Sequence, residues 1–347
     1  MELVEYQAKF KSFLTQWCAS KRESLSKHAF PESVQSLIHH GLDLIASEGK
    51  RVRPYIARLA YEYHGGNSEI SILQLGLVLE LLHVFALIHD DWMDRGRVRR
   101  DVTTAHIFME HVFEEQKRLG DLVHCAASQA VLLGDLVFGW VYQELDKLAP
   151  DAALRNCFQK MIDEVIFGQM LDVDSTTCDV ASTKSIHQKM LFKTASYTFI
   201  YPLQLGALLA GDNTLESVYY SLGSALGIAY QMQDDLLDII SDSTGKTPFS
   251  DITNHQHSIC TQYIFDHGTV VQKDFLRSQW GKMNFSSDEK TALRNMFSDS
   301  GAIAYAQQEM NQAFEQASQL VRTHWQRTSS AQSLEKLIAM LINRMPS

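Results

Sequence analysis

The sequence has few cysteines, few prolines and no surplus of positive charge, and each shortage argues against a class of protein. Its five cysteines are scattered, odd in number and without Cys-X-X-Cys spacing, which is typical of reduced cytoplasmic thiols rather than of a disulfide framework. The formal net charge of -10 argues against a nucleic-acid partner that relies on a general basic field. An anionic ligand must therefore be bound by local arginines, by lysines or by a metal ion.

The sequence also lacks strand-like alternation over any useful length, and its six prolines leave long intervals free for helices. These features predict an all-α protein. The length of 347 residues is compatible with one large helical domain over 1–347, since the one break in composition is a short polar loop from Ser241 to Ser250. We expect helices at residues 5–27, 32–47, about 54–63, 69–94, 103–117, 120–146, 151–172, 183–210 and 214–239, and several after residue 256.

No membrane anchor is expected from the sequence. The N-terminal stretch from Met1 to Leu14 carries interspersed charges and has no signal-peptide core. The long apolar stretch further along is interrupted by Glu80 and His83. The sequence therefore predicts a cytoplasmic protein without a membrane span.

Two aspartate-rich motifs of the same form are the most informative feature of the chain. They are Asp90-Asp91-Trp92-Met93-Asp94 and Asp234-Asp235-Leu236-Leu237-Asp238, and each ends a long apolar helical stretch. The first and last aspartates of a motif are four residues apart, so their carboxylates project from one face of a helix and repel each other. Hard oxygen ligands favour Mg²⁺, which usually keeps water and substrate phosphates in its shell. Two such clusters facing each other would bind a polyphosphate through bridging metal ions.

The simpler interpretation is that both motifs are solvated acidic faces of surface helices. Their flanks, residues 79–89 and 226–232, argue against it, because these segments are apolar on most sides, as core helices are.

Basic residues gather at two places near these motifs. Lys50, Arg51 and Arg53 share an expected loop, and Arg99 and Arg100 follow the first motif. Guanidinium groups and helix N-termini both suit diphosphate oxygens. Two simpler interpretations stay open, an ordinary basic surface loop for the first group and counter-ions of the neighbouring aspartates for the second.

Single polar residues on apolar helices are further candidates. His83 lies two helical turns before the first motif, where a core histidine is the simpler interpretation. Lys193-Thr194 lies in a helix so apolar that the lysine must either point at an anion or pair with a local carboxylate. Gln231 shares a face with the second motif, although a core hydrogen bond would serve as well. Lys246, in the loop after that motif, could close over a phosphate or be solvated.

Taken together, these segments resemble the trans-isoprenyl diphosphate synthases of the polyprenyl synthetase family, of the short-chain type. The resemblance covers most of the chain, from Gly49 to about Asp251. Its ordered elements are Gly49-Lys50-Arg51-Val52-Arg53-Pro54, Glu80-Leu81-Leu82-His83, both aspartate motifs, Arg99-Arg100, Leu133-Gly134-Asp135, Gly168-Gln169 with Asp172, Lys193-Thr194, Gln231 and Gly245-Lys246. The resemblance implies a helical bundle around a deep central cavity, a homodimer, and a cofactor of three Mg²⁺ ions.

The resemblance also implies head-to-tail prenyl transfer through an allylic carbocation, with a role for each site residue. The residues implied to bind the diphosphate of isopentenyl diphosphate are Lys50, Arg53, His83 and Arg100. Those implied to hold Mg²⁺ on the allylic diphosphate are Asp90, Asp94 and Asp234, with Asp238 supporting a third ion through water. Those implied to contact the allylic diphosphate oxygens are Arg99, Lys193 and Lys246, and those near the developing cation are Thr194 and Gln231.

The sequence departs from the family pattern at three positions. Asp101 stands where glycine usually follows the arginine pair, and Gln233 stands where an aliphatic residue is usual. Gln256 lies near the position of a usual lysine, so one cationic contact to the allylic diphosphate would be missing.

Product length is expected to depend on the depth of the tail cavity below the first motif. Phe85 lies five residues before Asp90, about 7.5 Å along the helix axis, beside the small Ala86. An aromatic ring there would stop elongation at a farnesyl or geranylgeranyl product, unless Phe85 is plain core packing.

Three other functions compete with prenyl transfer. A class I terpene cyclase would not need a second phosphate pocket such as the loop from Gly49 to Pro54. A non-catalytic subunit of a heteromeric prenyl synthase would be expected to lack carboxylates from one motif, and both motifs are complete here. The third alternative is an acidic helical scaffold.

Overall fold

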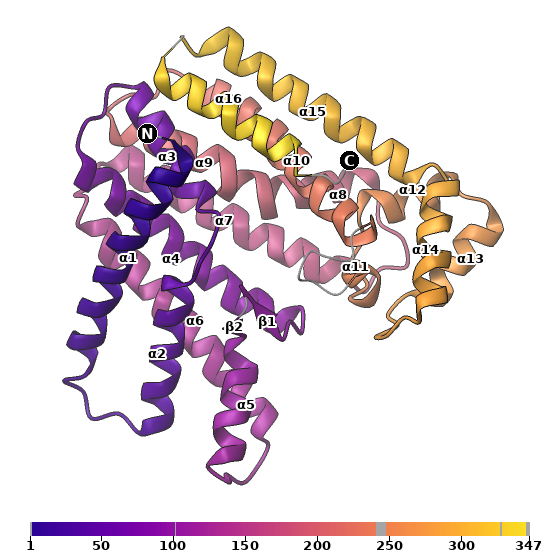
Figure 1. Ribbon diagram of the computed structural model, residues 1–347, viewed down its shortest axis with the longest axis horizontal. Coiled ribbons are helices and arrows are strands. Elements are labelled where there is room, and N and C mark those ends of the chain that lie inside the picture. Colours follow the sequence, from indigo (N-terminus) through magenta and orange to yellow (C-terminus); the bar gives the residue numbers. More distant parts are fainter. Residues whose placement is uncertain (1, 101, 241–247, 327, 345–347) are drawn as a thin grey trace. The chain divides into compact units, whose positions relative to one another are not determined.

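The computed structural model describes residues 2–100, 102–240, 248–326 and 328–344 (Figure 1). Over these residues the protein is helical apart from one pair of very short strands, so the predicted all-α class is confirmed. The chain divides into two compact units. The N-terminal unit is Met1–Arg155 with Gly206–Gly211, and the C-terminal unit is Asn156–Leu205 with Asp212–Ser347. The single domain over 1–347 stays a prediction.

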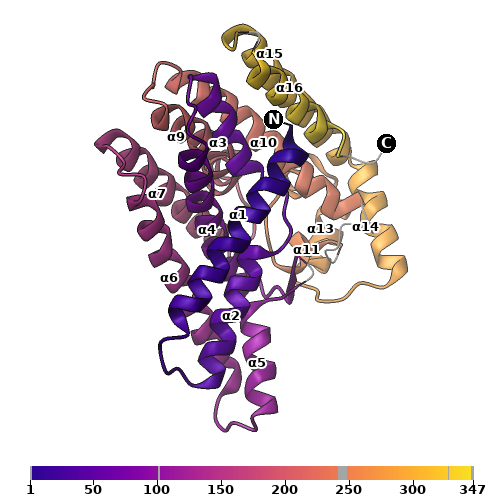
Figure 2. The same cartoon turned by 60° about the vertical axis from the view of Figure 1, so that its left-hand side comes forward.

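The N-terminal unit is built around one apolar helix, α4. Its elements are α1 (Leu3–Leu25), α2 (Glu32–Ala46), α3 (Val52–Tyr63), α4 (Glu69–Met93), α5 (Ala105–Glu115) and α6 (Leu122–Asp146). Helix α4 packs against α1, α2, α3 and α6, while α1 and α2 lie side by side (Figure 2). The Ser68 hydroxyl caps the start of α4 by accepting from the Ser71 N–H, and Asp94 caps its end. The first aspartate motif therefore lies in the last turn of a core helix.

A short hairpin follows the first motif. Strand β1 (Val98–Arg99) pairs antiparallel with β2 (Val102–Thr103), with Val98 opposite Thr103. Two residues per strand are too few to show alternation in a sequence, so the hairpin was not predicted.

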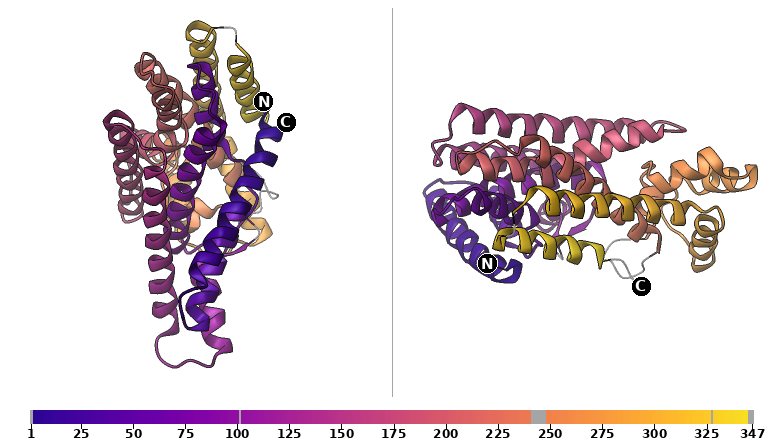
Figure 3. Two further views of the ribbon diagram at one scale, coloured as in Figure 1. Left: turned by 90° about the vertical axis from the view of Figure 1, so that its left-hand side faces the viewer. Right: turned by 90° about the horizontal axis from the view of Figure 1, so that it is seen from above.

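The C-terminal unit is centred on α10, which carries the second motif and packs against η1, α12 and α15. Figure 3 shows α15 and α16 side by side. The elements are α7 (Ala152–Ser175), α8 (Thr183–Lys189), η1 (Met190–Ile200), α9 (Tyr201–Leu209), α10 (Glu216–Ile240), α11 (Ser250–Thr253), α12 (Ile259–His267), α13 (Val270–Gln279), α14 (Ser287–Asp299), α15 (Ala302–His324) and α16 (Ser329–Ile342). The start of α7, up to Arg155, and the end of α9, from Gly206, belong to the N-terminal unit.

The segment η1 is a π-helix within the stretch predicted as one helix, 183–210. Its apolar pattern could not reveal the change from four-residue to five-residue hydrogen bonding. Wider turns of this kind are frequent at functional sites, and η1 carries the predicted residues Lys193 and Thr194.

Among the residues that the structure describes, two helices, α4 and α6, are long and apolar enough to cross a membrane by length and composition alone. In α4, 67% of the most apolar window is buried inside the protein, which accounts for its composition as that of a core helix. In α6 the corresponding share is 33%, and the helix exposes large apolar side chains including Val131 and Leu132.

Candidate functional site

Glu80 on α4 is the centre of a buried charge cluster in the N-terminal unit. Its side chain is 2% exposed, and Arg51, 4% exposed, donates to its Oε1. Arg100 donates to the same oxygen from both of its terminal nitrogens, each at 3.2 Å. One carboxylate thus faces two guanidinium groups, and the cluster has an excess of positive charge that suits an anion.

Arg51 and Arg100 both have left-handed backbone conformations, with φ of 50° and 53°. Such a conformation costs roughly 1–3 kcal/mol for a residue other than glycine and persists where the surroundings enforce it. Here the shared ion pair with Glu80 supplies that constraint.

The residues predicted to bind isopentenyl diphosphate lie around this cluster. His83 is one turn beyond Glu80 on α4, and its surroundings, chiefly burial and then the charges of Arg53 and Arg100, hold its pKa well below the usual range. Its ring is therefore neutral at pH 7. Lys50 is exposed in the preceding loop, where its backbone carbonyl accepts from the Gln7 amide at 2.8 Å.

The arginine after the first motif acts as a counter-ion in this structure. Arg99 donates from Nε to Asp91 Oδ1 at 2.7 Å, and its Nη2 lies 3.5 Å from Asp90 Oδ2. Asp91 is buried, whereas Asp90 and Asp94 are partly exposed. The Arg99 pairing is the simpler of the two interpretations left open by the sequence. The partly exposed pair, Asp90 and Asp94, is the part of the motif that a cation can reach.

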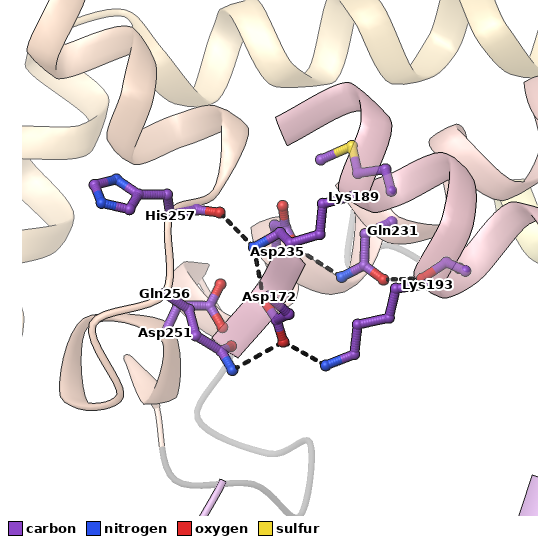
Figure 4. A pocket seen from close by; sticks show the side chains of 10 residues that line it. Asp172, Lys189, Lys193, Gln231, Asp235, Asp251, Gln256 and His257 are labelled. Atoms are coloured by element: carbon purple, nitrogen blue, oxygen red, sulfur yellow. Dashed lines mark hydrogen bonds and ion pairs between the residues drawn. The ribbon is translucent and has the colours of Figure 1, made fainter. Parts of the chain in front are cut away.

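In the C-terminal unit, a polar pocket collects side chains from four segments of the chain (Figure 4). Asp172 on α7 is buried and contacts Lys193 on η1, while Lys189 Nζ lies 2.9 Å from its other oxygen. Burial alone would raise the pKa of Asp172, but the charges of Lys193 and Lys189 hold it below its usual value. Lys193 therefore pairs with a local carboxylate, as one of the two interpretations expected.

A hydrogen-bonded chain connects Thr194 to the second motif in the same pocket. The Thr194 hydroxyl donates to Gln231 Oε1 at 2.6 Å, and Gln231 Nε2 donates to Asp235 Oδ1 at 2.8 Å. Burial raises the pKa of Asp235 to about 6, although its bond to Gln231 opposes that rise. The chain fixes which way the Gln231 amide points, so its carbonyl oxygen is directed at Thr194.

Two glycines allow the helices of this pocket to approach each other. A Cβ on Gly168 of α7 would lie 2.3 Å from the backbone nitrogen of Lys193. A Cβ on Gly227 of α10 would lie 2.2 Å from both Cα and Cβ of Ala195. Only glycine permits these contacts, which bring α7 and α10 against η1 and so position Asp172 and Gln231.

Replacing Gly227 with alanine should therefore destabilise the C-terminal unit. We expect a loss of about 1–3 kcal/mol in the free energy of unfolding, the usual cost of overpacking, measured by urea denaturation. Gly139→Ala is the control, because a Cβ at Gly139 meets nothing within 4 Å. Equal stability of the two variants would contradict the close-approach role of Gly227.

The second motif contacts the C-terminal helix and the residue just beyond it, and this contact was not predicted. Arg344, just beyond α16, pairs through Nη1 with Asp234 Oδ1 at 2.6 Å and lies over the ring of Tyr230. Gln233, 0% exposed, donates to the backbone carbonyl of Leu341 at 2.7 Å, which accounts for a polar residue at that position. No local pattern links Arg344 to Asp234.

The remaining predicted residues differ in how far the structure describes them. Asp238 is nearly buried, and its carboxylate accepts from the backbone and hydroxyl of Ser250 at 2.9 and 2.7 Å and from the Asp251 N–H at 3.2 Å. It therefore holds the start of α11. Lys246 and Asp101 lie outside the described residues.

The donor chemistry of the two motifs fits Mg²⁺. Asp90, Asp94 and Asp234 offer partly exposed carboxylate oxygens, and a guanidinium group already lies beside two of them. Within the described ranges, no three His, Cys, Asp or Glu side chains form a ready-made metal site. This is consistent with Mg²⁺, which is commonly bound by one or two carboxylates and completes its shell with water and substrate phosphates.

Comparisons with known proteins agree with this chemistry. The family model described as polyprenyl synthetase matches residues 34–297. The geranylgeranyl diphosphate synthase of Methanosarcina mazei is 30% identical over 270 residues, covering 76% of each chain. The geranylfarnesyl diphosphate synthase of Aeropyrum pernix is 29% identical over 276 residues, covering 77% of this chain and 80% of that protein. A crystal structure of geranylgeranyl pyrophosphate synthase from Corynebacterium glutamicum, complexed with isoprenyl diphosphate and magnesium, has a TM-score of 0.92 at 25% identity, covering 99% of this chain and 100% of that one.

Proposed function

This chain belongs to the polyprenyl synthetase family and is a trans-prenyltransferase, and we propose that it condenses isopentenyl diphosphate with an allylic diphosphate to a geranylgeranyl or farnesyl product. The observation that carries the proposal is the pair of partly exposed carboxylates, Asp90 and Asp234, each at the end of a core helix and each beside a guanidinium group. Such carboxylates can bind a cation, and Mg²⁺ is commonly bound by one or two carboxylates together with the phosphates of a substrate.

Asp90, Asp94 and Asp234 would hold Mg²⁺ with the allylic diphosphate, and Asp238 would support a third ion through water. When bound, Mg²⁺ neutralises the charge that develops on the leaving diphosphate. Lys193 contributes a further positive charge from η1, and Arg99 contributes one from the hairpin. In the described state both cations are paired with aspartates, which orients their side chains. Lys246 is the third proposed contact of the allylic diphosphate.

The reaction breaks the bond between the allylic carbon and the diphosphate oxygen, which leaves an allylic carbocation. The double bond of isopentenyl diphosphate then forms a new carbon–carbon bond to that carbon, and one proton leaves for the released diphosphate. The Thr194 hydroxyl and the Gln231 amide oxygen would stabilise the cation by their dipoles, since their mutual hydrogen bond fixes both orientations.

The cluster around Glu80 is the proposed site for the diphosphate of isopentenyl diphosphate. Arg100 and Arg53 supply guanidinium groups, neutral His83 supplies a ring nitrogen, and Lys50 supplies an ammonium group from the exposed loop. Glu80 would support this site indirectly, because its carboxylate accepts a hydrogen bond from Arg100 and holds that side chain in place.

The proposed limit on product length is Phe85, which lies with Ala86 on the partly exposed side of α4. The Phe85 ring packs against Phe138 of α6 with centroids 4.6 Å apart, and against His89 at 4.7 Å. These two neighbouring rings restrict the movement of the Phe85 ring, as a barrier to a growing chain requires.

Phe85→Ala should shift the main product by at least one isoprene unit toward longer chains, because the variant removes the ring that would end the tail cavity. Product sizing by chromatography of the dephosphorylated alcohols measures the shift. Phe30→Ala, at an exposed position, is the matched control. An unchanged product distribution in Phe85→Ala would make Phe85 ordinary core packing.

A homodimer is the proposed assembly, and the exposed apolar side chains of α6 are its support. Val131 and Leu132, which are adjacent and exposed, would be covered by a second copy rather than by lipid. This accounts for a long apolar helix without assigning it to a membrane.

Neither a class I terpene cyclase nor a non-catalytic subunit is favoured, because the named relatives are prenyl diphosphate synthases and both aspartate motifs are complete. The test is incubation of the purified protein with Mg²⁺, isopentenyl diphosphate and each allylic diphosphate in turn. Elongated prenyl diphosphates are expected, and their formation should stop with EDTA. Cyclic hydrocarbons formed without isopentenyl diphosphate would support a cyclase, and no product with any starter would support a subunit without catalytic activity.

A further inference from the structure

Lys189 is a second lysine in the pocket of the C-terminal unit, and no sequence motif includes it. It is the last residue of α8, one helical turn before Lys193, and its side chain is 14% exposed. Its Nζ lies 2.9 Å from Asp172 Oδ1 and donates to the backbone carbonyl of His257 at 2.8 Å (Figure 4). An ammonium group has three N–H donors, so these two acceptors leave it able to bind a further oxygen.

Gln256 lies at the same carboxylate. Its amide Nε2 is 3.4 Å from Asp172 Oδ2, the oxygen that Lys193 contacts. Lys189 and Gln256 therefore come from different segments of the chain and end beside one aspartate. A lysine at position 256 would bring a third ammonium group to Asp172. It would lie close to the ammonium groups of Lys189 and Lys193, and like charges repel. The presence of Lys189 thus accounts for an uncharged residue at 256.

We propose that Lys189 supplies the cationic contact that Gln256 cannot make, and that its ammonium group binds a phosphate oxygen of the allylic prenyl diphosphate. The inference rests on the proposed function of this pocket. Asp172 would position the ammonium groups of Lys189 and Lys193 together, because each lysine pairs with a different oxygen of its carboxylate. The carboxylates that line the pocket are those of Asp172, Asp235 and Asp251. A diphosphate bound there would therefore depend on Lys189 and Lys193 for local positive charge.

A competing role for Lys189 is a purely structural tie between α8 and the loop at His257. The two roles differ in what can replace the lysine. A tie depends on a donor at position 189, whereas a phosphate contact depends on a positive charge in the pocket, whichever segment brings it.

The test uses the full-length enzyme and a reciprocal exchange. In Lys189→Met, the KM for the allylic diphosphate should rise about 10- to 100-fold, as expected for loss of one hydrogen bond to a charged group, while the KM for isopentenyl diphosphate changes little. Adding Gln256→Lys to that variant should restore the allylic KM to within a few-fold of wild type. Lys184→Met, which removes an exposed lysine from the same helix, should match wild type.

If Lys189→Met does not fold, Lys189→Gln replaces it, because an amide keeps a donor for the His257 carbonyl while removing the charge. Binding of inorganic diphosphate with Mg²⁺, followed by titration calorimetry, is then the readout. A wild-type allylic KM in the charge-free variant, or no rescue by Gln256→Lys, would overturn the proposal for Lys189. A wild-type enzyme that elongates no allylic diphosphate would instead overturn the proposed function.

Discussion

Asp90→Asn is expected to lower kcat roughly 1000-fold. Removing one electrostatic contact to the leaving group typically costs 10²- to 10³-fold, and Asp90 is also a proposed ligand of the metal ion on that group. Asparagine keeps the shape of the side chain and one oxygen, so the change is in charge. The melting temperature should change little, since the substitution removes repulsion between Asp90 and its neighbouring carboxylates as well as the 3.5 Å pair with Arg99, which keeps its bond to Asp91. The measurements are steady-state condensation kinetics and a thermal unfolding curve.

Asp163→Asn is the matched control for that variant. Asp163 is exposed on α7, where it accepts from the Gln159 amide at 2.8 Å. Its substitution should leave kcat unchanged. If Asp90→Asn kept kcat within tenfold of wild type at saturating Mg²⁺, Asp90 would not be a metal ligand.

Glu80→Gln is expected to cost about 3–5 kcal/mol in the free energy of unfolding, the usual result of removing one partner from a buried ion pair. The variant leaves the guanidinium groups of Arg51 and Arg100 close together without their shared carboxylate. It also removes the contact that holds both arginines in left-handed conformations. Chemical denaturation of the purified variant measures the loss.

The matched control is Glu48→Gln, because Glu48 pairs with Lys11 at 2.8 Å on the surface, where its side chain is 88% exposed. Exposed pairs of this kind contribute little to stability, and no change in the unfolding midpoint is expected. Equal stability of Glu80→Gln and wild type would show that the cluster around Glu80 is not held by its charge.

The sequence predicted the helices well where one apolar face repeats. The stretch 69–94 was expected as a helix and α4 is Glu69–Met93, because the core helix carries its own signal in its composition. The π-helical turns of η1 were not predictable, since an apolar pattern does not distinguish four-residue from five-residue hydrogen bonding. The hairpin at 98–103 was too short to leave a pattern.

Candidate site residues could be selected from the sequence where they belong to a local motif, but not where they meet only across helices. Gln231 was expected on the face of the second motif, and Lys193 and Thr194 were expected at the allylic substrate. The structure brings all three into one pocket with Asp235. Lys189 and Arg344 were missed. Lys189 is an isolated lysine in the sequence, and the pairing of Arg344 with Asp234 depends on where α16 packs. Tertiary packing, rather than local sequence, recruits both cations.

The measurement that tests the central claim most directly is binding of inorganic diphosphate by titration calorimetry, with and without Mg²⁺, in wild type, Asp90→Asn and Asp234→Asn. If both motifs contribute metal ligands for one diphosphate, wild type should bind it only with Mg²⁺, and either substitution should weaken that binding by at least tenfold. Wild-type affinity in either variant, or equal affinity in EDTA, would contradict the claim.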